Sequence, residues 1–256
     1  MRETVADFRY KTSCGRITGR SHAHSKTPCQ DYAAVRHTSD LACIALADGA
    51  GSREKSEFGS EAAVKATIRF VCSNFEELWS QAEADSVTVS HKLLSYCLEA
   101  LQRKAKRLKC EVGELACTLM FVVHSKGRFL AGHLGDGFIA RLGDDGEVIA
   151  LSHPDNGEFA NTTVFVTDTT AHRRFRLIRG EGDCEPGFVI MSDGTAESLY
   201  LRATRTPAAS AIKSLLRWNS SLSKLKMKKV LNSNLEQVFS KKSADDCSIA
   251  ILSIKS

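Results

Sequence analysis

The sequence predicts an α+β fold in which antiparallel β-sheets carry helices on their outer faces. Four segments, ACTLMFVVH, GRFLAGHLG, FIARLG and EVIALS, follow one another with only turn residues between them. Such a run indicates an antiparallel meander. Helical patterns are grouped before and after this meander and do not alternate with single strands, so the order disfavours a doubly wound parallel sheet.

The remaining elements follow in order along the chain. Short strands are expected in YAAVRH and LACIALAD, before a helix over about residues 56–79. A second helix is expected over about residues 87–108, where apolar residues recur at helical spacing. After the meander we expect a loop over about residues 153–163, strands near TVFVTD, RFRLIRG and GFVIMSD, basic helices, and a strand in CSIAILSI.

Length and composition are those of a globular protein. The chain has 256 residues, of which 43% are hydrophobic and 25% charged, so we expect one domain over residues 1–256. No apolar run approaches the roughly 18 residues that span a bilayer, and no apolar signal segment begins the chain. We therefore expect a soluble cytoplasmic protein without a membrane partner. The nine cysteines lack a C-x-x-C pair and are expected to be buried, reduced thiols.

Positive charge is concentrated late in the chain. Residues 201–242 hold ten Lys or Arg against a single acidic residue, Glu236, although the net charge of the whole chain is only +5. Helices with solvated basic faces are the first interpretation. A docking surface for an acidic partner is the second. Nucleic acid is disfavoured because no aromatic residues alternate with the charges.

Five aspartates lie where strands end or begin, and they suggest a metal site: Asp31, Asp48, Asp136, Asp193 and Asp245. Carboxylates at one end of a sheet repel one another unless cations neutralise them. Oxygen ligands select hard cations such as Mg²⁺ or Mn²⁺, and two such ions activate water for attack on a phosphoester. Asp145, also followed by Gly, lies between two alternating strands and is expected to form only a hairpin turn.

The same aspartates lie in five segments that resemble the motifs of a known family. In order they are SHAHSKTPCQDYAAV, IALADGAGS, AGHLGDGFIARL, VIMSDGTAESL and ADDCSIAIL. Together they resemble the metal-dependent protein phosphatases of type 2C, in their bacterial branch. The resemblance implies a four-layer α/β/β/α sandwich of two packed antiparallel β-sheets flanked by helices. It also implies hydrolysis of phosphoserine and phosphothreonine in a phosphorylated protein substrate, by a metal-bridging hydroxide.

The resemblance assigns expected roles residue by residue. The cofactors would be two Mn²⁺ or Mg²⁺ ions, with a third, weaker ion as in bacterial relatives. The catalytic metal ligands would be Asp48, which bridges both ions, with Asp193 and Asp245. Supporting positions would be the carbonyl of Gly49, Gln30 through water, Asp31 beside it, and Asp136 at the third ion.

Departures from the family pattern leave one alternative open. Lys26 stands where many relatives use Arg to bind substrate phosphate, so Lys26 and the nearby His24 are the candidate phosphate contacts. Ala50 occupies the place of a His found in eukaryotic members, and Asp246 replaces an Asn that commonly follows the last ligand. The alternative function is a catalytically inactive, phosphatase-like module that binds a partner.

Overall fold

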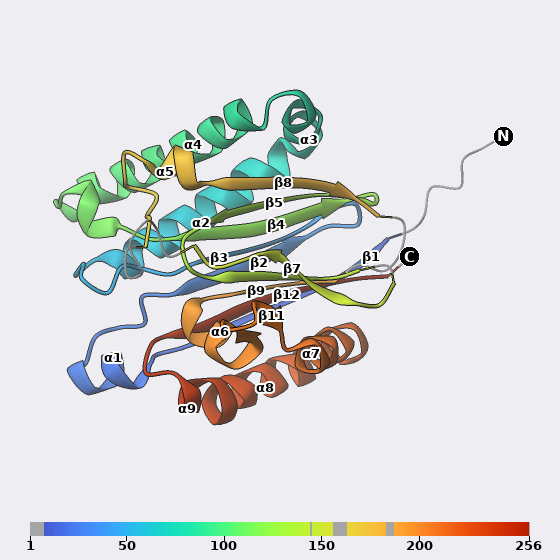
Figure 1. Ribbon diagram of the computed structural model, residues 1–256. Coiled ribbons are helices and arrows are strands. Elements are labelled where there is room, and N and C mark those ends of the chain that lie inside the picture. The colour runs from blue at the N-terminus through green and yellow to red at the C-terminus, as the bar shows by residue number, and fades with distance from the viewer. Residues whose placement is uncertain (1–7, 144, 156–162, 183–186, 256) are drawn as a thin grey trace.

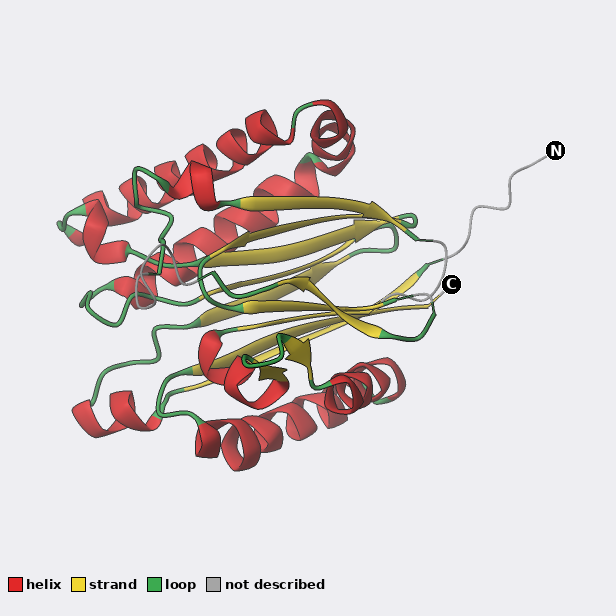
Figure 2. Cartoon of the chain, in the orientation of Figure 1, coloured by secondary structure: helices red, strands yellow, loops and turns green. Residues whose placement is uncertain are grey.

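The computed structural model describes residues 8–143, 145–155, 163–182 and 187–255. Two five-stranded antiparallel sheets stack face to face, and helices cover both outer faces (Figures 1 and 2). The predicted four-layer α/β/β/α sandwich is therefore confirmed. No helix in the described part of the chain is long and apolar enough to cross a membrane.

The first sheet carries the long helices of the first half of the chain. Its strands, in spatial order, are β2 (Tyr32–His37), β3 (Ala42–Ala47), β4 (Leu119–Ser125), β5 (Arg128–Leu134) and β8 (Arg176–Glu181). Its outer face is covered by α2 (Ser56–Ser73), α3 (Phe75–Ala84) and α4 (Ser86–Leu108), with the short α5 (Ala171–Arg174) beside α4.

The second sheet carries the basic helices. Its strands, in spatial order, are β1 (Arg9–Ile17), β12 (Cys247–Lys255), β9 (Gly187–Met191), β6 (Phe138–Leu142) and β7 (Val148–Ser152). The covering helices are α6 (Asp193–Leu199), α7 (Ala209–Ser221), α8 (Lys224–Asn234) and α9 (Ser240–Lys242), with a π-helical turn over Leu235–Phe239. A small hairpin of β10 (Tyr200–Leu201) and β11 (Thr206–Pro207) follows α6, and α1 (Arg20–Ser25) joins β1 to β2.

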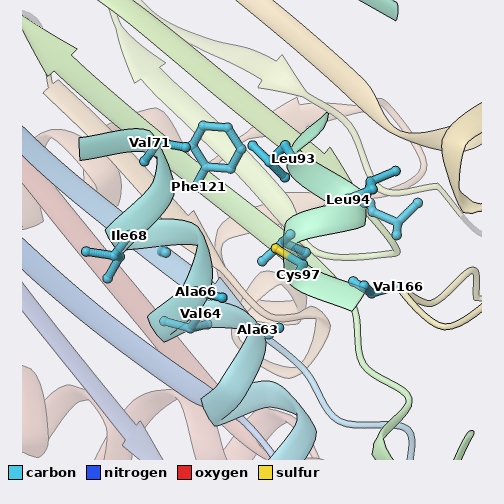
Figure 3. Packing of buried hydrophobic residues seen from close by; sticks show 14 of the residues in the cluster. Ala63, Val64, Ala66, Ile68, Val71, Leu93, Leu94, Cys97, Phe121 and Val166 are labelled. Atoms are coloured by element: carbon cyan, nitrogen blue, oxygen red, sulfur yellow. The ribbon is translucent and has the colours of Figure 1, made fainter. Parts of the chain in front are cut away.

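Strand β4 shows why the central strands are continuously apolar. All seven of its residues are buried, because one face meets helices and the other meets the second sheet. Phe121 points into the layer that Val71, Leu93 and Cys97 fill from α2 and α4 (Figure 3). Met120, its neighbour, packs between the two sheets instead. The period-2 alternation of a strand thus serves two cores at once.

Two local expectations were wrong, and one strand was not expected at all. The unexpected strand is β1 (Arg9–Ile17), an edge strand whose polar side chains obscure the strand pattern. The expected strand near TVFVTD is a loop, closed by Asp168 accepting a hydrogen bond from the Phe165 N–H (2.8 Å). The expected helix over residues 56–79 breaks at Asn74, whose side-chain amide donates to the Phe70 carbonyl (2.8 Å). The expected loop over residues 153–163 lies mostly outside the described residues.

Candidate functional site

Four of the five strand-end aspartates line one cavity of about 160 Å³. They are Asp48, which follows β3, Asp136 between β5 and β6, Asp193 at the start of α6, and Asp245 before β12. Gly49 and His22 share the lining. The loops that bring them together gather at the end of the sandwich where α1 lies (Figure 1).

The sheet hydrogen bonds fix the positions of these aspartates. The Asp48 N–H donates to the Thr118 hydroxyl and the Thr118 N–H donates to the Asp48 carbonyl, both at 2.8 Å. Across the second sheet, the Ser192 N–H donates to the Ser248 carbonyl (3.1 Å) and the Ser248 N–H to the Ser192 hydroxyl (3.0 Å). These two hydrogen bonds hold Asp193, the residue after Ser192, beside the first residues of β12.

The five carboxylates lie within one another's electrostatic field. Burial raises the pKa of Asp48 well above its usual range, and the charges of the other four aspartates raise it further. Burial likewise raises the pKa of Asp193 to about 7, with the charges of Asp136 and Asp245 adding to the effect. The predicted gathering of like charges is therefore present in the folded chain, and it disfavours full ionisation without cations.

Asp31 lies behind the cavity and does not line it. Its exposed fraction is 0%, and neither carboxylate oxygen makes a hydrogen bond of ordinary geometry, although the Ser192 and Ser248 hydroxyls lie nearby. Burial raises the pKa of Asp31 to about 7, and the charge of Asp246 is the next cause. A buried carboxyl whose oxygens accept no hydrogen bond of ordinary geometry from the described residues indicates a site completed by something besides these side chains.

Gln30 is also buried and lies outside the cavity lining. Its side-chain amide donates to the Arg53 carbonyl (3.0 Å), and its buried Oε1 has no hydrogen-bond partner. Its carbonyl accepts from the Gly49 N–H (3.2 Å) and from the Ser60 hydroxyl (2.6 Å). Gln30 thus supports the loop that carries Asp48 and leaves one acceptor free.

The neighbours Asp245 and Asp246 face in different directions. Asp245 is exposed and lines the cavity. Asp246 is only 2% exposed, and its two oxygens accept hydrogen bonds from the backbone N–H groups of Gly19 (2.7 Å) and Gln30 (2.6 Å). Asp246 therefore ties together three segments around the site, while Asp245 offers its carboxylate to the cavity.

Helix α1 contributes a residue that sequence reasoning did not select. His22 lines the cavity, and its Nδ1 lies 3.0 Å from Asp246 Oδ2. The predicted phosphate contacts His24 and Lys26 lie exposed on the same helix and its C-cap, outside the cavity lining. The residue pattern alone did not distinguish these three, because the direction of a six-residue helix depends on the distant Asp246.

Thr163 is a second residue that sequence reasoning missed. Its hydroxyl donates to Asp136 Oδ2 (2.6 Å) and it lines the cavity next to that carboxylate. It lies at the end of the expected loop over residues 153–163, where the chain was expected to continue as a strand, and the residue pattern did not single out Thr163 as a site residue.

The donor set is compatible with hard divalent cations. Every candidate ligand offers oxygen, from a carboxylate, a side-chain amide or the Gly49 carbonyl, and such ligands suit Mg²⁺ and Mn²⁺. No three His, Cys, Asp or Glu side chains among the described residues are grouped so that they could hold one ion. Mg²⁺ fits this spacing, since it is commonly held by one or two carboxylates and completes its shell with water.

Comparisons with known proteins agree with this geometry. The family model described as "Protein phosphatase 2C" matches residues 18–236. Over 176 residues the chain is 27% identical to Serine/threonine-protein phosphatase 3 of Escherichia coli (strain K12), an alignment that covers 64% of this chain and 65% of that protein.

Solved structures share the fold at low identity. The catalytic domain of the serine threonine protein phosphatase PstP, in complex with two manganese ions, superposes with a TM-score of 0.63 at 15% identity, covering 98% of this chain and 99% of that one. RsbX in complex with magnesium gives a TM-score of 0.59 at 14% identity, covering 96% of both chains. With the family match over most of its length, the chain belongs to the protein phosphatase 2C family.

Proposed function

We propose that this protein is a Mg²⁺- or Mn²⁺-dependent phosphatase that hydrolyses phosphoserine and phosphothreonine in proteins. The observation that carries the proposal is the group of five aspartates, four lining one cavity and Asp31 behind it, whose charges help to raise the pKa values of Asp48 and Asp193. Such a group is costly unless divalent cations neutralise it. The names of the relatives support it, since one is a serine/threonine-protein phosphatase and two solved structures carry manganese or magnesium.

Within this proposal, the cavity residues hold the ions. Asp48 with the Gly49 carbonyl, Asp193 and Asp245 would hold two ions, and Asp136 with Thr163 beside it would hold a third. Gln30 and Asp31 are buried behind the residues that line the cavity and would act through water. When bound, two such ions supply a nucleophile from water at neutral pH and neutralise the charge of the phosphoryl group.

The chain's own residues prepare the cavity for this chemistry. Thr118 fixes the backbone of Asp48 through two hydrogen bonds. His22 Nδ1 lies 3.0 Å from Asp246 Oδ2, and His22 lines the cavity, where an imidazole can donate a hydrogen bond to a phosphoryl oxygen. A phosphorylated side chain in the cavity would therefore have both the carboxylate-held cations and His22 within its surroundings.

The test compares two aspartates that share the same dipeptide. Asp193→Asn removes a cavity carboxylate, whereas Asp145→Asn changes an exposed hairpin residue whose side chain accepts a hydrogen bond from the Glu147 N–H (2.9 Å). With Mn²⁺ present, turnover of p-nitrophenyl phosphate and of a phosphothreonine peptide should fall at least about 100-fold in Asp193→Asn and stay near wild type in Asp145→Asn. Chelation should abolish turnover by the wild type. Metal-independent turnover, or equal rates in wild type and Asp193→Asn, would refute the proposal.

A separate comparison concerns the phosphate contact on α1. His22→Gln should raise KM for the phosphothreonine peptide about tenfold or more, as expected for loss of one hydrogen bond to a charged group. His24→Gln and Lys26→Gln test the contacts expected from the sequence on the same helix. If either of these changes KM more than His22→Gln does, the assignment to His22 is wrong.

The alternative is a phosphatase-like module that binds a partner without catalysis. The exposed positions of Lys26 and His24 favour it, since neither reaches the cavity. The complete set of cavity aspartates disfavours it. Absence of turnover by a folded, Mn²⁺-binding wild type would favour the module.

A further inference from the structure

A second cavity lies on the side of the sandwich where its edge strands β1 and β2 face each other. It is a groove of about 540 Å³, closed by the junction of α7 and α8. It shares no lining residue with the aspartate cavity. Asp31 immediately precedes β2 and Arg36 of the groove lies near the other end of that strand, so about 17 Å of strand separates them.

The groove carries positive charge from three different elements. Lys11 of β1, Arg36 of β2 and Lys224 of α8 all line it, and no Asp or Glu of the described residues does. All three side chains are exposed, and no carboxylate among the described residues forms an ion pair with any of them. Lys11 instead donates to the carbonyl of Leu222 (3.1 Å). The positive charge at this groove is therefore not compensated by the described part of the protein.

Helix α8 extends the same charge beyond the groove. Lys226, Lys228 and Lys229 are exposed, and the described residues offer none of them a carboxylate partner. Like charges close together on one helix destabilise it slightly. Leu225, between Lys224 and Lys226, is 67% exposed. A basic, partly apolar surface of this kind suits a partner of opposite charge that also offers apolar side chains.

The interior of the groove favours a protein segment over nucleic acid or a membrane. Val35, Leu222 and Met227 give it apolar lining, and its volume accommodates one or two side chains. Tyr10 is the single Phe, Tyr or Trp residue of the lining and is only 9% exposed, and the ring of His37 is held by a hydrogen bond between its Nδ1 and the Thr12 hydroxyl (2.8 Å), so the lining offers no series of rings for base stacking. A concave pocket flanked by cations also differs from the flat apolar face that inserts into a lipid surface.

We propose that this groove docks an acidic segment of a partner protein. Acidic side chains of the segment would pair with Lys11, Arg36 and Lys224, and an apolar side chain would enter between Val35, Leu222 and Met227. The partner is independent of the reaction at the aspartate cavity, so its binding does not require turnover.

The experiment measures binding of a short fluorescein-labelled peptide of Glu and Asp with two central Leu, by anisotropy, to the full chain carrying Asp193→Asn. The triple variant Lys11→Glu, Arg36→Glu, Lys224→Glu should bind at least about tenfold more weakly, because three attractive pairs become repulsive. The control triple variant Arg69→Glu, Lys106→Glu, Arg107→Glu makes the same charge change at exposed positions of α2 and α4. It should change affinity less than about twofold at physiological salt, where distant charges are screened.

Several results would overturn this docking proposal. Equal weakening by both triple variants would indicate general charge attraction and no groove. Equal affinity for a peptide that has Ala in place of Leu would show that no apolar side chain of the peptide enters the groove. Tighter binding of a DNA oligonucleotide or of anionic phosphatidylserine vesicles would assign the surface to another class of partner. Binding that appears only after deletion of residues 1–7 would assign the groove to the chain's own N-terminal segment.

Both triple variants keep the aspartate cavity intact, so failures of the two proposals can be told apart. In the wild-type background, each triple variant should remain folded at the assay temperature and hydrolyse p-nitrophenyl phosphate at the wild-type rate. Loss of peptide binding with retained hydrolysis supports the groove. Retained peptide binding without hydrolysis leaves the groove in place and refutes the proposed phosphatase activity.

Discussion

Asp245 and Asp246 are adjacent residues with separate tasks. Asp246 is buried and accepts hydrogen bonds from the Gly19 and Gln30 backbones, while Asp245 is exposed toward the cavity. The chemical type of the residue is the same in both. The backbone direction at the start of β12 decides which carboxylate is structural and which is available to a ligand.

This division predicts that substitution of Asp246 affects mainly stability, whereas substitution of Asp245 affects mainly hydrolysis. Asp246→Ala leaves two buried N–H groups without an acceptor and should lower the free energy of unfolding by roughly 2–4 kcal/mol. Asp245→Ala should lower it by less than about 1 kcal/mol, since an exposed carboxylate is removed, yet it should abolish Mn²⁺-dependent hydrolysis. Urea denaturation and p-nitrophenyl phosphate turnover measure the two effects. Equal destabilisation by both substitutions would contradict the division.

At the scale of residues, the sequence predicted which aspartates would meet but not how they would be layered. Strand ends are readable from apolar runs, and Asp48, Asp136 and Asp193 do meet at one cavity. The set-back positions of Gln30 and Asp31, and the contact of His22 with Asp246, depend on pairs far apart in sequence. Local patterns carry no information on such distances.

At the scale of elements, α2 is held close to the segment that precedes β4. A Cβ added at Gly59 of α2 would lie 2.0 Å from the Leu115 carbonyl oxygen, at the end of the 3₁₀ turn Val112–Leu115. The next residue, Ala116, accepts a hydrogen bond from the Ala50 N–H (2.9 Å), beside Asp48 and Gly49. The packing of α2 against this turn is therefore connected to the aspartate cavity through Leu115, Ala116 and Ala50.

Gly59→Ala tests this close packing. Ala favours a helix over Gly by about 1 kcal/mol, but the clash with backbone should outweigh that gain and lower stability by roughly 1–3 kcal/mol. Gly113→Ala, in the same 3₁₀ turn, is the control because nothing lies within 4 Å of its added Cβ. Its unfolding free energy should stay within about 0.5 kcal/mol of wild type. If Gly59→Ala is as stable as the control, the close approach is unimportant.

Helices and strands with a regular apolar period were the ones predicted from the sequence. The meander and the long helices follow regular apolar periods, and the structure contains them. Strand β1 escaped prediction because its edge position leaves Lys11 and Arg16 exposed and weakens the alternation. Its place is determined by antiparallel pairing with β12, more than 200 residues away. Arg9 lies opposite Lys255 at one end of the pair, and Ile17 lies opposite Cys247 at the other.

At the scale of the whole molecule, the buried carboxylates link folding to pH. Burial and the charge of Asp246 raise the pKa of Asp31 from 3.8 to about 7, so between these values the folded chain holds a proton that the unfolded chain has released. Stability from this group is complete below pH 4 and is lost as pH rises through 7. The buried His124 and His133 act in the opposite direction, because burial lowers their pKa values.

Asp31→Asn isolates the carboxylate contribution from that of the histidines. In the presence of chelator, the variant and the wild type should be similarly stable near pH 4, and the variant should become the more stable of the two as pH rises to 7 and above. Urea denaturation across this range measures the difference. A difference that is independent of pH would show that Asp31 titrates normally. Mn²⁺ should reduce the difference at pH 7, because it neutralises the cluster around Asp31 in the wild type.

The family match and the fold agree at this scale, while the expected single domain over residues 1–256 stays a prediction. The two packed antiparallel sheets and their helical layers are those that the family resemblance implied. Composition predicted an ample core but not its division into three apolar layers, because that division depends on which faces meet.

Strand β12 is made after every other described strand, yet it lies inside its sheet, between β1 and β9. Until residues 245–255 have left the ribosome, β1 has no partner and the aspartate cavity lacks one wall. A chain still in synthesis therefore lacks an assembled aspartate cavity. Translation stopped shortly before this strand would leave Asp48, Asp136 and Asp193 without Asp245 and without the Ser192–Ser248 hydrogen bonds beside Asp193.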